Sequence, residues 1–310
     1  MNPLTITGAS GFVGTRLTQV LDERKRTYIT LSHRLGASVR PPIQPGSAVI
    51  HLAGLAHRMN KHSEGDLEAY RDANVRWSLQ VAKLAVECGA SRFIYVSTIK
   101  VNGERTDKTP FTAQDSPNPR GPYALSKWEA EQGLSEICAA ANLEFMVVRP
   151  PLIYGPGVKG NLNRLMRLIA SGLPLPFGSA FGVRSMISAT NLSDFLLYLT
   201  DLEEGAVVPS KQSSIREKLE PWGYPIFLPS DIHLSTVNLI RALAEKMGKP
   251  AKLIPIPSFF FRPTRLYNRL FSSLSVDPRE CMEIGWKNRV TADEALGEMV
   301  QSFRFSHAHA

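Results

Sequence analysis

The sequence predicts an α/β fold in which a doubly wound parallel sheet is joined to a smaller, mostly helical C-terminal lobe. Three observations support this fold class. Short apolar segments rich in Val, Ile and aromatic residues alternate with helical patterns through the first half of the chain. A glycine-rich turn directly follows the first of these segments. After residue 150, Pro and Gly become frequent and helical patterns predominate.

Five segments predict buried strands, because they are too short for helices and rich in β-branched and aromatic residues. They lie at residues 3–7, 27–31, 48–52, 92–97 and 144–149. Between the third and fourth segments, apolar residues at helical spacing predict a helix, and Gly89 is suited to end it. The core-facing residues of this helix are expected to be Ala73, Trp77, Val81, Leu84 and Cys88.

Four further helical patterns occur in the second half of the chain, at residues 160–171, 190–200, 235–248 and 291–303. The segment 207–223 lies between the second and third of them. We interpret it as a surface loop, with a lid over a ligand as the alternative.

The composition of this 310-residue chain, 43% hydrophobic and 21% charged, is ordinary for a globular protein. No apolar run approaches the ~20 residues that a membrane span requires, and the amino terminus lacks the pattern of a signal peptide. The three cysteines, Cys88, Cys138 and Cys281, are widely spaced without a pairing pattern. We therefore expect reduced thiols and a cytoplasmic location.

The formal net charge is +8, from 36 Lys and Arg against 28 Asp and Glu. The basic residues are scattered and are not interleaved with aromatic residues as in RNA-binding surfaces. This distribution favours anionic small ligands over nucleic acid. His51, His57 and His62 lack further residues at the spacing of metal ligands, so no metal site is expected.

The motif "TGASGFVG" places Gly8, Gly11 and Gly14 between the first predicted strand and the first helix. In such a turn the first glycine allows the bend, the second lets backbone approach a pyrophosphate, and the third lets helix and strand pack closely. Backbone amides and the positive end of the helix then face the phosphates. A plain turn is the alternative, but this position in a strand–turn–helix unit favours a Rossmann-like dinucleotide site.

The second predicted strand ends in "LSHR", residues 31–34, without the acidic residue that commonly holds the adenosine ribose. Ser32 and Arg34 could instead hold a 2′-phosphate, although a solvated turn is an equally good interpretation. The cofactor is therefore expected to be NAD or NADP, with NADP slightly favoured.

Tyr123 and Lys127 stand at positions i and i+4 of a predicted helix, one above the other on the same face. A cation within a few Å lowers the pKa of an acid by ~1–3 units, which would bring the pKa of Tyr123 toward a working pH. Ser97 and Thr98 end the preceding strand, where their hydroxyls would lie near a nicotinamide and could bind a substrate hydroxyl or carbonyl. Taken alone, a Tyr–Lys pair is common and Ser97–Thr98 could merely begin a turn.

Read together and in this order, "TGASGFVG", "HLAG", "AN" at 73–74, "VSTIKVNG" and "YALSK" resemble the extended short-chain dehydrogenase/reductases of the NAD-dependent epimerase/dehydratase family. The later segments 183–195 and 275–286 are also similar to that family, so the resemblance covers nearly the whole chain. Within the family, the chain most resembles bacterial UDP-glucose and UDP-N-acetylglucosamine 4-epimerases and the 4-keto-reductases that form UDP-N-acetylquinovosamine.

This resemblance implies a role for particular residues. Tyr123 is expected to transfer the proton, Lys127 to tune it and hold the nicotinamide ribose, and Thr98 to occupy the Ser/Thr position of the family. Other expected cofactor-binding residues are Ser10, Phe12, Val13, Leu52, Ala53, Gly54, Asn74, Ser97 and Pro150. Expected substrate-binding residues, besides Thr98, are Lys100, Asn161, Leu162, Phe177, Arg184 and Arg269. The guanidinium groups of the two arginines suit the diphosphate of UDP.

The implied organisation is an NAD(P)-binding Rossmann domain over residues 1–155, with later strand segments from about 174–200, interleaved with a UDP-sugar lobe over 156–310. The same resemblance implies that the protein forms a homodimer and that it acts in polysaccharide biosynthesis.

The sequence departs from the family's sugar 4,6-dehydratases, which carry an Asp-Glu pair where this chain has Ile99 and Lys100. Dehydration is therefore disfavoured. The first expectation is a UDP-sugar 4-epimerase working by reversible hydride transfer at carbon 4, and the second is an NAD(P)H-dependent 4-keto-reductase. A non-catalytic dinucleotide sensor is the alternative of another class, and the intact Thr98, Tyr123 and Lys127 argue against it.

Overall fold

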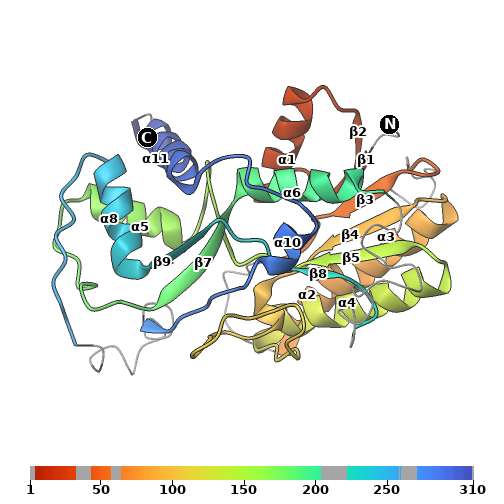
Figure 1. Cartoon of the computed structure of the whole chain (residues 1–310), viewed down its shortest axis with the longest axis horizontal. Coiled ribbons are helices and arrows are strands. Elements are labelled where there is room, and N and C mark those ends of the chain that lie inside the picture. Colours follow the sequence, from red (N-terminus) through yellow and green to blue (C-terminus); the bar gives the residue numbers. More distant parts are fainter. Residues whose placement is uncertain are drawn as a thin grey trace.

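The computed structural model describes residues 4–32, 43–56, 64–203, 222–257, 259 and 271–308. A sheet flanked by helices and a smaller lobe built around α5, α8 and α11 lie side by side, as Figure 1 shows. Each expected strand of the first half forms within one residue of its predicted ends, because each is a short apolar run bounded by turn residues.

The main sheet has six strands in the order β2-β1-β3-β4-β5-β8, and every neighbouring pair is parallel. Its strands are β1 (Leu4–Thr7), β2 (Tyr28–Leu31), β3 (Ala48–His51), β4 (Arg92–Val96), β5 (Glu144–Val148) and β8 (Ile226–Phe227). The chain leaves β1 toward β2 on one side and continues to β3 on the other. Ligands of open parallel sheets bind at such a switch point, outside the carboxyl ends of the strands.

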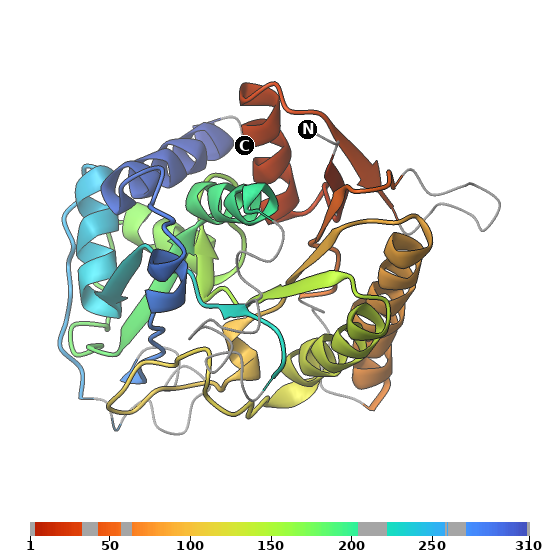
Figure 2. The same ribbon diagram turned by 45° about the vertical axis from the view of Figure 1, so that its right-hand side comes forward.

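Helices cover both faces of this sheet, as Figure 2 shows. On one face lie α1 (Phe12–Glu23) and α6 (Ala189–Asp201), and on the other α2 (Glu64–Arg71), α3 (Trp77–Glu87) and α4 (Gly121–Ala140). The buried face of α1 consists of Leu17, Val20 and Leu21, whose spacing places them on one side of the helix. The predicted doubly wound α/β fold is confirmed.

The helix expected before Gly89 is interrupted by the π-helical segment η1 (Asp72–Arg76) between α2 and α3. A π-helical turn holds more residues than an α-helical turn and so rotates the helix that follows. As a result, Asn74, Ser78 and Ala85 are buried with Val81. The other expected core residues, Ala73, Trp77, Leu84 and Cys88, are only partly buried.

The lobe contains a second sheet of β6 (Leu152–Tyr154), β7 (Val183–Ser188) and β9 (Ile232–Ser235), covered by α5 (Asn161–Ala170), α8 (Thr236–Lys246) and α11 (Ala292–Ala308). Strand β7 is parallel to β6 and antiparallel to β9. The strand expected near 174–200 thus pairs in the lobe, while α6, which follows it, packs on the main sheet. Among the described residues, no helix is both long and apolar enough to span a membrane.

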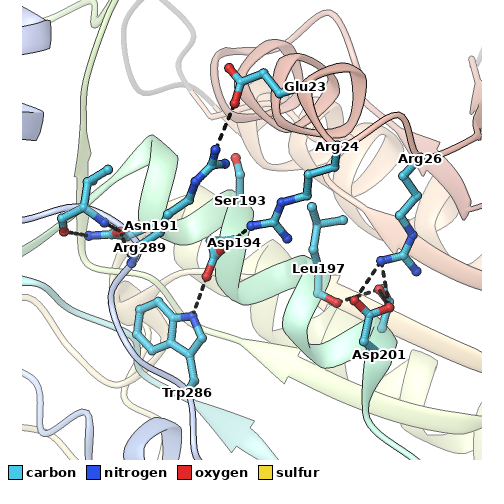
Figure 3. Close-up of polar contacts among 12 residues, drawn as sticks. Glu23, Arg24, Arg26, Asn191, Ser193, Asp194, Leu197, Asp201, Trp286 and Arg289 are labelled. Carbon is cyan, nitrogen blue, oxygen red and sulfur yellow. Dashed lines mark hydrogen bonds and ion pairs between the residues drawn. The ribbon is translucent and has the colours of Figure 1, made fainter.

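The carboxyl end of α1 is tied to α6 and to the C-terminal segment by polar contacts, as Figure 3 shows. Asp194 on α6 accepts hydrogen bonds from Arg24 and from Nε1 of Trp286, the latter at 3.0 Å. Arg26 pairs with Asp201 at the end of α6, at 2.7 Å. The helix that starts at the glycine turn is therefore held by two distant parts of the chain.

Residues 207–221 of the expected surface loop lie outside the described residues. Trp222, which follows them, packs edge-on against Trp128 of α4 with ring centroids 5.4 Å apart. The short helix α10 (Arg279–Glu283) places Cys281 in the core shared by α1 and α6.

Candidate active site

The glycine turn lies at the switch point between β1 and β3 and is too tight for side chains. A Cβ on Gly14 would lie 2.2 Å from the carbonyl oxygen of Gly8. Gly8 has a φ of 71°, and a Cβ there would lie 2.7 Å from the backbone nitrogen of Ala53. The Gly11 amide donates to the Gly8 carbonyl at 2.9 Å. This close backbone approach at the start of a long helix is what a pyrophosphate cradle requires, so these residues fit a dinucleotide.

The other residues of the glycine turn divide into exposed and packed positions. Ser10 and Gly11 are exposed. Val13 packs against the core beneath α1 and α6, and Phe12 packs against the core of the lobe. At the end of β2, Ser32 is exposed, and Arg34 lies outside the described residues.

His51, at the end of β3, is fully buried and hydrogen-bonded through both ring nitrogens. Ser78 donates to the backbone carbonyl of Asn74 at 2.7 Å, so its oxygen accepts from Nε2 of His51 at 2.9 Å. Nδ1 of His51 then accepts from the Thr7 hydroxyl at 2.8 Å. Burial, with a smaller contribution from the charge of Lys127, lowers the pKa of His51 to about 3. His51 is therefore a neutral residue that joins β1, β3 and α3.

Asn74 connects the turn after β3 to α4. Its Oδ1 accepts from the Leu55 amide at 2.7 Å, and its Nδ2 donates to the Leu55 carbonyl at 3.1 Å and to Oγ of Ser126 at 3.0 Å. A Cβ on Gly54 would lie 2.9 Å from Oδ1 of Asn74 and 3.5 Å from Nζ of Lys127. The structure thus brings together the "HLAG" turn, Asn74 and Lys127, as a common cofactor site requires.

Ser97 and Thr98 leave β4 at the same edge of the sheet. The Ser97 amide donates to the Val148 carbonyl at 2.7 Å, while its buried Oγ has no hydrogen-bond partner within the described ranges. Thr98 begins the 3₁₀ turn η2 (Ile99–Val101), and its Oγ1 accepts from the Lys100 amide at 3.3 Å. The Ile99 amide donates to the carbonyl of the buried Pro150 at 3.1 Å, which joins this turn to the end of β5.

Tyr123 lies in the first turn of α4 and is half-buried. Its ring is tilted against that of Tyr70, with centroids 6.0 Å apart. Burial raises the pKa of Tyr123 to about 12, although a hydrogen bond with the Thr98 side chain opposes the rise. The expected lowering of this pKa by Lys127 is therefore wrong for the structure described, because loss of water outweighs the neighbouring groups.

Lys127 is 4% exposed, and its Nζ lies 4.3 Å from the ring centroid of Tyr95, over the ring face. Burial lowers the pKa of Lys127 to about 7, and the carboxylate of Glu131 partly opposes this shift. The spacing of four residues does place Tyr123, Lys127 and Glu131 along one face of α4.

The expected substrate-binding residues lie on several elements. Lys100 is exposed on η2, and Asn161 is exposed at the start of α5. Arg184 is partly buried on β7, opposite Leu234 of β9. Phe177 is partly buried against the core of the lobe, whereas Leu162 is 4% exposed within it, so that only its backbone could reach a ligand. Arg269 lies outside the described residues.

Several site residues were not found from the sequence. His51 and Ser126 lie within the motifs "HLAG" and "YALSK" but were assigned no role, and Ser78 and Tyr70 belong to no motif. Glu131 had a signal, because it lies four residues after Lys127 on the same helical face. Over the part of the chain that the structure describes, no group of three His, Cys, Asp or Glu side chains could hold a metal ion.

Comparison with known proteins agrees with this geometry. The model of the NAD dependent epimerase/dehydratase family matches residues 4–208. A UDP-glucose 4-epimerase of Vibrio cholerae is 33% identical over 97% of this chain and 95% of its own length.

Two solved structures share the fold. The UDP-glucose 4-epimerase of Thermus thermophilus in complex with NAD has a TM-score of 0.71 at 19% identity, covering 98% of this chain and 99% of that one. RMD from Pseudomonas aeruginosa complexed with NADPH has a TM-score of 0.74 at 21% identity, covering 98% and 100%. Because the family match runs from β1 through α6 and a relative is similar along nearly the whole chain, this protein belongs to the NAD dependent epimerase/dehydratase family.

Proposed function

We propose that this protein is a UDP-sugar 4-epimerase that acts on a UDP-hexose or a UDP-N-acetylhexosamine. One observation carries the proposal: Thr98 is hydrogen-bonded to Tyr123 and Lys127 lies beside Gly54, in a chain 33% identical to a UDP-glucose 4-epimerase over 97% of its length. A dinucleotide sensor would need the glycine turn but none of the three side chains. A bound NAD(P)⁺ would supply the hydride acceptor for sugar carbon 4, and its positive charge would favour the phenolate of Tyr123.

The side chains of this site divide the remaining work. Tyr123 takes the proton of the sugar 4-hydroxyl and later returns it, while Thr98, hydrogen-bonded to Tyr123, orients the same oxygen. Lys127 holds the nicotinamide ribose. Gly8, Gly11 and Gly14, together with the residues of the "HLAG" turn, hold the dinucleotide. Lys100, Asn161 and Arg184 are candidates for the UDP-sugar half, with Arg269 assigned from the sequence.

A 4-keto-reductase is the second candidate, and the residues at the end of β2 favour it. Ser32 and Arg34 stand there in place of an acidic residue, which suits the 2′-phosphate of the NADPH that such a reductase would consume. Such an enzyme uses only the return half of the epimerase reaction. It consumes one reduced cofactor for each turnover, whereas an epimerase consumes none.

One experiment distinguishes the two reactions. The purified protein is incubated with UDP-glucose and, separately, with UDP-N-acetylglucosamine in the presence of NAD⁺, and the products are followed by proton NMR. The C4 epimer should appear without net change in the cofactor. Failure with both sugars, combined with oxidation of NADPH by a UDP-4-keto-6-deoxy-N-acetylhexosamine, would replace the epimerase with the reductase.

We infer a modest preference for NADP(H) over NAD(H), of about 10-fold. The basis is the end of β2, where Ser32 and Arg34 stand in place of an acidic residue that would repel a 2′-phosphate. Arg34→Asp should invert the preference, and added salt should weaken it. Calorimetric titration of both cofactors at low salt tests this inference, and equal or tighter binding of NAD(H) would contradict it. A homodimer is inferred from the family resemblance and is tested by light scattering.

A further inference from the structure

A buried arginine contacts the elements that carry the candidate catalytic residues. Arg149 follows β5, and neither it nor its partner Glu131 on α4 has any exposed side-chain surface. Nη2 of Arg149 donates to Oε2 of Glu131 at 2.6 Å, and Nε approaches the two carboxylate oxygens at 3.1 and 3.2 Å. This is the two-pronged contact that a planar guanidinium makes with a carboxylate.

The third arm of Arg149 reaches the turn after β4. Nη1 donates to Oδ1 of Asn102 at 2.9 Å, and Nδ2 of Asn102 donates to the Thr112 carbonyl at 3.3 Å. Asn102 closes η2, the turn that Thr98 begins, and its amide donates to the Ile99 carbonyl at 2.9 Å. One guanidinium therefore joins the end of β5, the middle of α4 and the turn after β4.

These three elements carry the groups to which the proposed reaction assigns a role. Glu131 lies one and two helical turns beyond Lys127 and Tyr123 on the same face of α4. Asn102 is four residues after Thr98, and Arg149 precedes Pro150, whose carbonyl accepts from Ile99. Glu131 also acts electrostatically on Lys127. The contacts of Arg149 thus connect the two elements, α4 and the turn after β4, that carry all three candidate catalytic residues.

Stability alone is a poor reason for this arrangement. Removing two charges from water costs free energy, and replacing a buried ion pair by well-packed apolar residues often leaves a protein as stable as before. A planar fork with fixed donors, however, restricts the relative orientation of the elements it joins. Misplacement of reacting groups by about 1 Å can lower a rate by roughly 100-fold.

We infer that Arg149, with Glu131 and Asn102, forms a positioning brace that holds Thr98 in register with Tyr123 and Lys127. These three are positioning residues, since they act through the residues they hold. The effect of these residues on turnover rests on the proposed function, whereas their effect on the relative positions of α4 and the turn after β4 does not.

The chain offers a matched control at the opposite end of the same two strands. Arg92 begins β4 and pairs with Glu144, which begins β5, at 2.5 Å, with side-chain exposures of 3% and 10%. Arg92 also donates to backbone carbonyls at the end of α6. Replacing either arginine by lysine keeps the charge and removes the fork from a buried pair, but only Arg149 adjoins the candidate site.

The first measurement, amide hydrogen exchange, needs no substrate. Arg149→Lys should speed exchange in residues 98–102 and 121–131 by about 10-fold or more, as expected for the loss of a hydrogen bond to a charged group. Arg92→Lys should leave these amides unchanged. Asn102→Ala leaves the Arg149–Glu131 pair intact and should loosen 98–102 alone, so it supplies the test if Arg149→Lys does not fold.

The second measurement is turnover with a UDP-sugar at a temperature well below unfolding of every variant. Arg149→Lys and Asn102→Ala should lower kcat by roughly 10- to 100-fold, with KM changed less than about threefold. Arg92→Lys should keep the native kcat. Native amide protection in both site variants, or a kcat loss shared with Arg92→Lys, would overturn the brace. If the native protein turns over no UDP-sugar, the proposed function fails while the exchange result still decides the brace.

Discussion

Lys127 carries a primary ammonium group into a buried position, and this placement costs free energy of folding. Its pKa is lowered by burial to about 7 from an ordinary value of 10.5. Between these two values the unfolded chain holds a proton that the folded chain has released, so stability rises with pH across this window. Below pH 7 the lysine is charged in both states and the desolvation cost is at its greatest.

Lys127→Met should therefore stabilise the protein while abolishing the proposed activity. The gain should be on the order of a few kcal/mol below the folded pKa and should shrink as the pH approaches the unfolded value. Urea unfolding across this range measures it, with Lys83→Met on the exposed surface of α3 as the control. A Lys127→Met protein less stable than the native one below pH 7 would refute the burial cost.

Tyr123→Phe removes only the hydroxyl that is proposed to move the proton. We expect kcat to fall by ~10²–10⁴, the usual contribution of a positioned acid or base, with the unfolding transition unchanged. Tyr28→Phe, on the edge strand β2, removes a phenolic hydroxyl away from the glycine turn and should keep full activity. Steady-state turnover with a UDP-sugar is the measurement, and near-native turnover by Tyr123→Phe would remove it from the proton-transfer role.

The Tyr123–Lys127 pair could be found from the sequence because residues four apart share a helical face. The ionisation of the pair could not, because spacing does not tell how much water reaches a side chain. The hydrogen bonds of His51 reach Thr7 and Ser78, which are 44 and 27 positions away in the chain. No local sequence pattern predicts such contacts.

Among the elements, the glycine turn at the start of α1 depends most strictly on residue size. Gly14→Ala would place a Cβ 2.2 Å from the Gly8 carbonyl oxygen, so the backbone must shift. We expect a loss of ~1–3 kcal/mol or more in stability, together with weaker dinucleotide binding. Gly297→Ala in α11 meets no atom within 4 Å and should stabilise the protein by ~0.5–1 kcal/mol. Urea unfolding and cofactor titration test both, and a Gly14→Ala protein with native affinity would contradict the cradle.

Substitutions at the contact between α1 and α6 should lower the stability of the protein without affecting catalysis. Asp194→Ala leaves Nε1 of the buried Trp286 without its acceptor and should cost ~1–3 kcal/mol (Figure 3). Asp201→Ala breaks a more exposed pair with Arg26 and should cost no more than ~1 kcal/mol. Chemical unfolding of the two variants is the comparison, and equal losses would contradict the importance of burial at Asp194.

Sequence patterns located the elements better than their connections. The five strands of the first half were predicted within one residue because apolar runs and turn residues mark both ends. The π-helical segment η1 was missed because an extra residue per turn changes the facing side chains without changing the composition. The pairing of β7 with β6 and β9 was missed because sheet partners distant in sequence leave no local signal.

In the whole molecule, the candidate site is assembled from the carboxyl ends of β1, β3, β4 and β5 and from the start of α4. The resemblance of ordered motifs was sufficient to predict the family, which the comparisons confirm. The brace around Arg149 was not predicted, since its partners Glu131 and Asn102 are 18 and 47 residues away. The spacing of Glu131 places it on the face of Lys127, but its pairing with Arg149 and the link to Asn102 are seen only in three dimensions.

The most direct test of the central claim follows one hydrogen atom. UDP-glucose carrying deuterium at carbon 4 is incubated with the protein and NAD⁺ in ordinary water, and the C4 epimer is examined by NMR and mass spectrometry. Reversible hydride transfer predicts a product that retains deuterium at carbon 4, in the native protein but not detectably in Tyr123→Phe over the same time. Loss of the label to water during epimerisation would contradict the proposed chemistry, and so would the absence of any C4 epimer from either UDP-glucose or UDP-N-acetylglucosamine.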